Sequence, residues 1–419
     1  MIARDVYDNG LCLLTESMPD VRSVSLGVWL TRGSRHEGGA ASGMAHFAEH
    51  MVFKGTTTRT AEDIAQEVDS MGGQLDAFTA KECTSYYVKV LDEHLPRAVD
   101  LLADLLLRPA FRADDIDREK KVILEEIKMV EDMPDDLVHE LFTSSFWPDH
   151  PLGRSILGSP ASVGGITGAA LRAFFEQSYT AGNLVVAVAG NLEHAAVRDL
   201  IGAAFGGLPA AAGPADETPP AASPSVLFRG KEIEQSHLCL GTQGYAQAHE
   251  DRYSSYVLNT VLGGSMSSRL FQNIREKRGL AYAVSSGLES YRDVGILTIY
   301  AGCDAAAVPE VVDLVVAELR DLRDRPLAAG ELQRAKDHLK GNLVLGLEST
   351  ANRMSQLARS EIYFGRQIDQ AEHLEHLDAV TAADVQRVAA DLFSNGGFAA
   401  TVVGPVGGAA PTTGQLDMG

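Results

Sequence analysis

The stretch SLGVWLTRGS, residues 25–34, has the composition of a β-strand. A second stretch, CLGTQGYAQA at residues 239–248, resembles it, and both contain a Leu-Gly pair. Leu26 and Leu240, the first residues of these pairs, lie 214 positions apart. Because recurrence of a segment at a long fixed spacing is the sign of an internal repeat, this pair of strands indicates two copies of one design.

Further matches extend the repeat along the chain. The apolar strand at residues 183–192, NLVVAVAGNL, has a counterpart in FAATVVGPVG at residues 398–407, with glycines again 214 positions apart. An apolar helical segment closed by a proline occurs at residues 98–111 and again at 311–327. Residues 208–225 are rich in Ala, Pro and Gly without an apolar period, which is typical of an exposed linker. We therefore predict two homologous domains, residues 1–210 and 226–419, joined by a linker at 211–225.

The order of the expected elements favours the α+β class. Strands such as TSYYVKVL and GILTIYAG mix with long amphipathic helices, such as residues 114–131, without a regular βαβ rhythm. We expect each half to hold a largely antiparallel sheet with helices on one face. A chain of 419 residues is also longer than a domain with a single hydrophobic core usually is, which again favours two domains.

The composition excludes some classes of protein. With 36 Lys and Arg against 57 Asp and Glu, the net charge is −21, which repels nucleic acid and anionic membranes and attracts cationic peptides. Solubility alone explains most of these charges equally well. No segment approaches the roughly 20 apolar residues of a membrane span, and the N-terminal region lacks the apolar core of a secretory signal. The cysteines lack C-x-x-C spacing and are expected to be reduced: Cys12, Cys83, Cys239 and Cys303. We expect a cytoplasmic protein with no nucleic-acid or membrane partner.

The most distinctive motif is GMAHFAEHMVFKGT, residues 43–56. His46 and His50 are four residues apart and share one face of a helix, so both imidazoles can bind one ion. Glu49 lies one residue before the second histidine and can take a proton from a water that the metal activates. H-x-x-E-H is a specific pattern, although two histidines on a helix can also be satisfied by hydrogen bonds in a core.

A catalytic zinc needs a third protein ligand. The acidic helix DIDREKKVILEEIKMVEDMPDD offers Glu119 and Glu126, which are two turns apart and share a face. Glu125 and Glu131 point elsewhere and are expected to be solvated. The spacing alone does not choose between Glu119 and Glu126.

The motif HFAEHMVFKGT, with Glu126 following His50 by 76 residues in VILEEIKMVE, resembles the M16 (pitrilysin/insulinase) zinc metallopeptidase family. The similarity covers nearly the whole chain and is closest to the bacterial, processing-peptidase-like branch (M16B). It implies that His46, His50 and Glu126 bind one Zn²⁺ per chain, that Glu49 is the general base, and that Glu119 orients the site. It also implies that two LuxS/metallohydrolase-like domains form a clam-like chamber, and that the chain pairs as a homodimer.

Two further segments carry the resemblance. SSRLFQNIREKRGLAYAVSS, residues 267–286, contains Arg275 and Tyr282, which in the family bind the substrate carbonyl and the developing oxyanion. Without the resemblance this segment is an ordinary basic helix end. GGQLDAFTAKECTSYYVKV, residues 72–90, contains the strand that in relatives pairs with an extended peptide; the residues concerned are Asp76, Ala77, Phe78 and Thr79. Asp76 stands where the family usually has Asn, and Phe78 and Thr79 suit an ordinary strand equally well.

The sequence thus predicts a zinc-dependent endopeptidase that cleaves extended peptides, with a preference for basic ones, through attack of a water assisted by Glu49. One alternative is a non-catalytic scaffold or core-type subunit of the same family, which need not bind zinc stoichiometrically. A second is a zinc hydrolase that acts on something other than peptides.

Overall fold

The computed structural model describes residues 2–210, 218–394, 397–405 and 410–418. Residues 211–217 of the predicted linker therefore lie outside the described residues, and residues 218–225 lie within them. The chain forms two compact units. One consists of Met1–Lys128, Arg154–Glu217 and Gly346–Gln367, and the other of Met129–Gly153, Thr218–Leu345 and Ile368–Gly419.

The first unit is built on a six-stranded sheet of order β1-β2-β6-β3-β5-β4. All neighbours are antiparallel except β2 and β6, which run parallel. The strand β4 is at one edge and has a paired neighbour on one side only. The strands are β1 (Ile2–Val6), β2 (Cys12–Ser17), β3 (Ser23–Leu30), β4 (Gln74–Thr79), β5 (Thr84–Leu91) and β6 (Leu184–Gly190).

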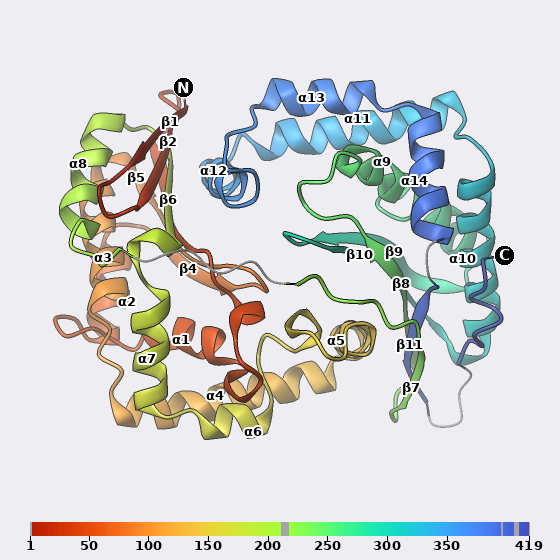
Figure 1. Cartoon of the computed structure of the whole chain (residues 1–419), viewed down its shortest axis with the longest axis horizontal. Helices are drawn as coiled ribbons and strands as arrows, with labels where there is room; N and C mark the ends of the chain where they lie inside the picture. The colour runs from red at the N-terminus through yellow and green to blue at the C-terminus, as the bar shows by residue number, and fades with distance from the viewer. Residues whose placement is uncertain (1, 211–217, 395–396, 406–409, 419) are drawn as a thin grey trace. The chain divides into compact units, whose positions relative to one another are not determined.

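Helices cover both faces of this sheet. The helices α3 and α8 pack on one face, and α12 packs against β2, β3 and β6 on the other (Figure 1). The helices of this unit are α1 (Met44–Val52), α2 (Ala61–Ser70), α3 (Leu95–Leu107), α4 (Ala113–Asp132), α6 (Pro160–Gly165), α7 (Gly168–Ser178), α8 (His194–Phe205) and α12 (Thr350–Phe364); α4 runs on into the second unit.

The second unit repeats the design on a five-stranded sheet of order β7-β11-β8-β10-β9. Its only parallel pair among the described residues is β7 with β11. The strands are β7 (Val226–Gly230), β8 (Gln235–Gly244), β9 (Ala281–Ser290), β10 (Gly295–Asp304) and β11 (Ala399–Gly404). The helices are α5 (Pro134–Phe146), α9 (Arg252–Leu262), α10 (Val308–Asp324), α11 (Ala329–Gly346), α13 (Gln370–Ala379) and α14 (Ala382–Ser394).

Short helical turns complete both units. The π-helical turn Phe271–Glu276 precedes β9. The 3₁₀ turns are Ser34–His36, Gly39–Ala41, Asp92–His94, Pro151–Gly153, Ala181–Asn183 and Ala305–Ala307.

The two sheets confirm the predicted α+β class with duplicated, largely antiparallel sheets. The order β2-β6-β3-β5-β4 in the first unit corresponds to β7-β11-β8-β10-β9 in the second, with the parallel pair in the same place. The structure adds a layer, because each sheet also has one helix on its other face: α12 on the first sheet and α5 on the second (Figure 1).

These extra helices are exchanged between the two halves of the sequence. The helix α12 comes from the C-terminal half and packs in the first unit, while α5 comes from the N-terminal half and packs in the second. The compact units therefore do not follow the two halves of the chain, and the boundaries at 210 and 226 stay a prediction about the duplication.

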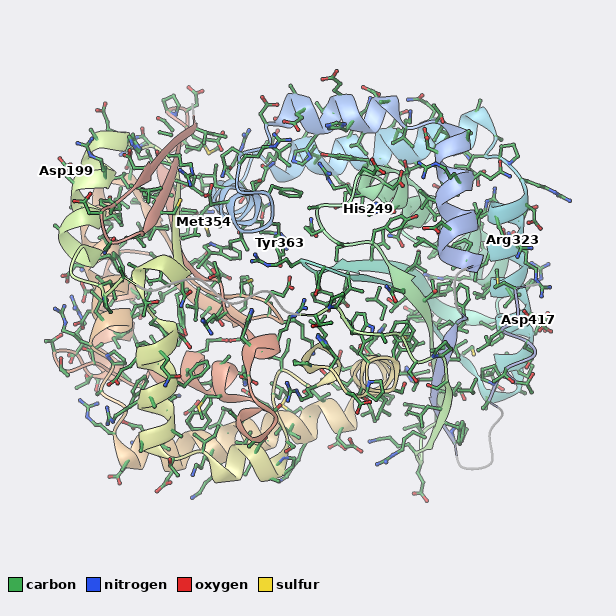
Figure 2. The ribbon with its side chains drawn as sticks, viewed as in Figure 1. Asp199, His249, Arg323, Met354, Tyr363 and Asp417 are labelled. Carbon is green, nitrogen blue, oxygen red and sulfur yellow. The ribbon has the colours of Figure 1, made fainter. Side chains whose placement is uncertain are left out.

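The repeated Leu-Gly pairs have a steric role in this exchange. A Cβ on Gly27 of β3 would collide with the Met354 side chain of α12, and a Cβ on Gly241 of β8 would collide with the ring of Phe142 of α5. Met354, labelled in Figure 2, is fully buried and accepts a hydrogen bond from Trp29 Nε1 at 3.2 Å. Each repeated glycine thus makes room for a side chain from the exchanged helix.

Two expectations about composition can be compared with the structure. The four cysteines are free and buried. Within the ranges that the structure describes, no helix is both long and apolar enough to cross a bilayer.

Candidate metal centre

Helix α1 presents the histidine motif at its solvent-accessible side. Phe47, Ala48 and Met51 are fully buried in the core of the first unit. His46, Glu49 and His50 are half-buried on the other side of the helix. The helical period therefore separates the packing residues from the chemical ones.

The N-terminus of α1 is held by a buried carboxylate. Glu37 accepts hydrogen bonds from the backbone N–H groups of Gly43, at 2.8 Å, and Ala45, at 2.5 Å. These are N–H groups that a helix cannot satisfy internally. Glu37 is 5% exposed, and burial raises its pKa to about 7 although the two backbone hydrogen bonds act in the opposite direction. Arg154 Nη2 donates to the Glu37 backbone carbonyl at 2.9 Å and so helps to fix this loop.

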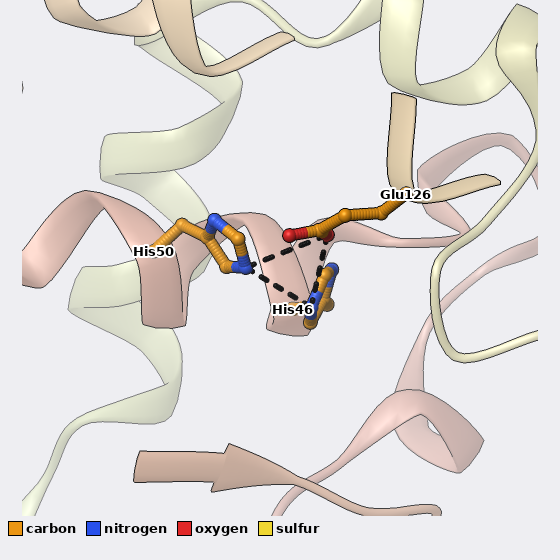
Figure 3. A group of neighbouring side chains, drawn as sticks. All are labelled: His46, His50 and Glu126. Atoms are coloured by element: carbon orange, nitrogen blue, oxygen red, sulfur yellow. Dashed lines mark hydrogen bonds and ion pairs between the residues drawn. The ribbon is translucent and has the colours of Figure 1, made fainter. Parts of the chain in front are cut away.

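The acidic helix predicted at residues 114–131 is α4, and it lies across from α1. Its glutamates Glu119 and Glu126 share the face that points toward the histidines (Figure 3 shows Glu126). Glu125 instead pairs with Lys128, and Glu131 pairs with Arg229, as expected for solvated charges.

Three side-chain atoms converge in front of α1 (Figure 3). The Nε2 atoms of His46 and His50 are 3.2 Å apart. Glu126 Oε2 lies 3.8 Å from the Nε2 of His46 and 3.7 Å from that of His50. Within the described part of the chain, no other group of three His, Cys, Asp or Glu side chains was found with this convergence.

The geometry of this trio fits a zinc ion. Ligand atoms about 2.0–2.1 Å from a shared tetrahedral ion lie roughly 3.3 Å apart, close to the separations of the three atoms here. Glu126 Oε2 is buried without a hydrogen-bond partner among the described residues, a cost that a cation removes. Two imidazoles and a carboxylate are also the donor set of catalytic zinc sites, which keep a fourth position open.

Glu119 lies behind the trio and contacts the opposite side of one histidine. Its Oε1 is 2.8 Å from His50 Nδ1, and its Oε2 is 2.8 Å from Lys54 Nζ. An Nδ1–H donated to Glu119 leaves the Nε2 lone pair of His50 directed at the trio. The structure therefore distinguishes the two glutamates that the spacing left open: Glu126 lies in the converging trio, and Glu119 contacts His50 from the other side of its ring.

The pKa values of the histidines follow from these surroundings. Burial, with the adjacent His50, lowers the pKa of His46 to about 4, so its imidazole is neutral at neutral pH. Burial lowers the pKa of His50 as well, but the hydrogen bond to Glu119 and the charge of Glu126 outweigh it and raise the pKa overall.

Glu49 is beside the trio and is held by the edge strand. Thr79 Oγ1 donates a hydrogen bond to Glu49 Oε2 at 2.5 Å. Burial raises the pKa of Glu49, while the hydrogen bond from Thr79 works against that rise. A raised pKa suits a carboxylate that must accept and later return a proton.

The four predicted strand residues fall on two faces of β4. Ala77 and Thr79 are on the face that packs toward α1. Asp76 accepts a hydrogen bond from Tyr87 Oη at 3.1 Å, and Phe78 makes an edge contact with Trp29, so both side chains are on the opposite face. Toward α1 and its histidines, β4 therefore presents only its backbone and the side chains on the face of Ala77 and Thr79.

In the second unit, the structure brings Arg275 and Tyr282 together. The Arg275 guanidinium carbon lies 5.2 Å from the centre of the Tyr282 ring and 4.7 Å from that of Phe271. The Tyr282 side chain is largely exposed at the start of the edge strand β9.

Two contributors were missed by the sequence reasoning. Glu37 has no periodic relation to α1, and only its place shortly before a helix start could have suggested a capping role. Lys54 lies four residues after His50, a spacing that could have suggested a charge on the same side as the histidine.

Two family descriptions match consecutive parts of the chain. Residues 12–160 match the family described as Insulinase (Peptidase family M16), and residues 165–339 match the family described as Peptidase M16 inactive domain. The first match contains His46, His50 and Glu126, and the second begins after them.

Relatives resemble the chain over nearly its whole length. It is 42% identical to an "Uncharacterized zinc protease" of Bacillus subtilis, covering 97% of this chain and 99% of the relative. It is 41% identical to a protein of that description from Streptomyces coelicolor, covering 97% of this chain and 90% of the relative. A protease from Helicobacter pylori of known crystal structure shares the fold, with a TM-score of 0.90 at 22% identity over 97% of this chain and 100% of the other.

Proposed function

The chain belongs to the M16 peptidase family, and from this we propose that it is a zinc-dependent endopeptidase that cleaves extended peptides or unfolded segments. The observation that carries the proposal is the convergence of His46, His50 and Glu126 with Glu49 beside them. Relatives named zinc proteases support the general class of peptidase. The narrower assignment to the processing-peptidase-like branch remains a prediction.

His46, His50 and Glu126 would hold one zinc ion per chain. A bound zinc ion supplies Lewis-acid polarisation of the scissile carbonyl and a lowered pKa for a water. Glu49 takes the proton from the attacking water and passes it to the leaving amine. The raised pKa of Glu49 supports both transfers, because a carboxyl group with a higher proton affinity is a better base and can return the proton.

An extended substrate would add to the free edge of β4. This strand is paired on one side only, and its backbone N–H and C=O groups offer the register of a further strand. Main-chain pairing is largely indifferent to side chains, and the net charge of −21 supports a preference for basic peptides. Replacing Arg and Lys by Gln in matched peptides should lower turnover. Unchanged turnover would contradict the proposed preference for basic peptides.

Arg275 and Tyr282 are assigned to the substrate carbonyl and the developing oxyanion. A guanidinium and a phenol are both hydrogen-bond donors suited to negative charge on oxygen. Their contact in the second unit and the exposure of Tyr282 support a joint role. We also propose that the chain forms a homodimer in the cytoplasm.

The alternative is a non-catalytic scaffold of the same family, and the match of residues 165–339 to a domain described as inactive favours it. That match does not include the metal-binding trio. The two functions differ in metal content and turnover. The purified chain, loaded with zinc, should hold one ion and cleave a peptide library in a chelator-sensitive manner; less than stoichiometric zinc and no cleavage would favour the scaffold.

A further inference from the structure

We propose that Thr79 is the positioning residue for the general base Glu49, and that it couples occupancy of the edge strand to catalysis. This inference rests on the proposed peptidase function. Thr79 is the last residue of β4, and its hydroxyl contacts the carboxylate of Glu49 on α1 across the packed face of the sheet.

Side chains of β4 point alternately to the two faces of the sheet, and this alternation places Thr79 on the face of Glu49. Asp76 and Phe78 are on the opposite face, where they contact Tyr87 and Trp29. Leu75 and Ala77 share the Thr79 face but have no polar side-chain atom. Thr79 is therefore the residue of this part of the strand that can hold a carboxylate.

The contact fixes one oxygen of the base. Oε2 of Glu49 accepts the Thr79 hydroxyl, which leaves Oε1 as the oxygen that takes the proton from water. A carboxylate fixed in one rotamer meets the water at a constant position, and positional errors of about 1 Å at such a group can cost ~100-fold in rate.

Thr79 itself is held by the hairpin that it ends. It is paired with Thr84 in β5, and Thr84 Oγ1 donates to the Arg32 carbonyl at 3.1 Å. The following turn is bound to the loop before α1, because Ser34 N–H donates to the Ala80 carbonyl at 3.1 Å. This attachment is reinforced by an ion pair between Arg35 and Glu82, both buried, at 2.8 Å.

Among the described residues, no further strand pairs with the outer edge of β4 in this hairpin. A peptide that pairs along this edge immobilises the strand that carries Thr79, and with it the hydrogen bond to Glu49. Long peptides should therefore have a higher kcat as well as a lower KM than short ones, because pairing along the strand orders the carboxylate of Glu49. The dependence of kcat on peptide length should thus require the hydroxyl group of Thr79.

The test compares Thr79→Val, which removes the hydroxyl at nearly constant shape, with Thr79→Ser, which keeps it. Loss of a hydrogen bond to a charged group corresponds to a ~10- to 100-fold fall in kcat. We expect this fall for Thr79→Val, with KM and zinc content unchanged within about two-fold, and recovery to within about three-fold for Thr79→Ser. Thr79→Val should also lose the dependence of kcat on peptide length. The matched control is Thr57→Val, at an exposed threonine outside the site.

Several outcomes would overturn the inference. They are wild-type kcat in Thr79→Val, an equal loss in the Val and Ser variants, or a loss confined to KM. A crystal structure of Thr79→Val with the Glu49 side chain unmoved would do the same. All of these can occur in an enzyme that binds zinc and cleaves peptides, whereas a wild-type chain without zinc or turnover contradicts the proposed function itself.

Discussion

Glu119 and His50 are in direct contact: Glu119 Oε1 is 2.8 Å from His50 Nδ1, on the side of the ring away from Glu126. Partners of this kind fix the tautomer and raise the basicity of a ligand, and their loss typically weakens metal binding ~10- to 100-fold. We predict this loss of zinc affinity for Glu119→Ala, measured by competition with a chelator of known affinity. Glu125→Ala is the matched control, because Glu125 is exposed on the same helix. Equal affinities in the two variants would contradict the role of Glu119.

Glu126 is expected to be a direct ligand. Glu126→Gln removes the charge and weakens the donor in the trio, so stoichiometric zinc should be lost on dialysis against a weak chelator. The readout is metal content by atomic emission, with Glu131→Gln on the same helix as control. Full retention of zinc in Glu126→Gln, with loss in Glu119→Gln, would reverse the assignment of the two glutamates.

The sequence predicted His46, Glu49 and His50 as a group because they lie within one short helix. The four-residue spacing of His46 and His50 is a property of one helix, and α1 confirms it. The choice between Glu119 and Glu126 depended on which turn of α4 lies opposite α1. That is a matter of tertiary packing, and only the family resemblance supplied it before the structure.

The parts that could not be predicted involve contacts between distant segments. Thr79 and Glu49 are brought together by packing of β4 on α1, and no local pattern specifies that contact. The amphipathic pattern of α12 predicts a buried face but does not say which sheet it covers, so the exchange of α5 and α12 was missed.

The buried carboxylate of Glu37 predicts a dependence of stability on pH. Its pKa of about 7 in the folded state is above the usual value of 4.5, so the folded state binds more protons than the unfolded state between these pH values. Protonation of Glu37 in the folded state therefore makes its largest contribution to the unfolding free energy below pH 4.5. This contribution is lost as pH rises through 7. From about pH 5.5 to 8.5 the loss amounts to about 2 kcal/mol.

The measurement is urea unfolding of the metal-free wild type and of Glu37→Gln across this pH range. The unfolding free energy of the wild type minus that of the variant should fall as pH rises, since Gln does not titrate. A difference that is constant, or that grows with pH, would contradict the raised pKa.

The exchanged helix α12 predicts a large effect of one methionine. Met354 is 1% exposed and sits over Gly27, so Met354→Ala leaves a cavity between α12 and the sheet. Such truncations cost about 2–5 kcal/mol of unfolding free energy. Met266→Ala is the matched control, because Met266 is 77% exposed and should cost little. Similar unfolding midpoints for both variants would contradict the packing of α12 on the first sheet.

The most direct test of the central claim is zinc content and peptide cleavage measured side by side in the wild type and in Glu49→Gln. Glu49 is next to the ligand His50 but outside the converging trio, so the variant should keep one zinc ion per chain. Loss of the base should lower kcat by ~100- to 10,000-fold. Cleavage by Glu49→Gln at the wild-type rate with zinc retained would contradict the account, because the proton would then be taken by another group.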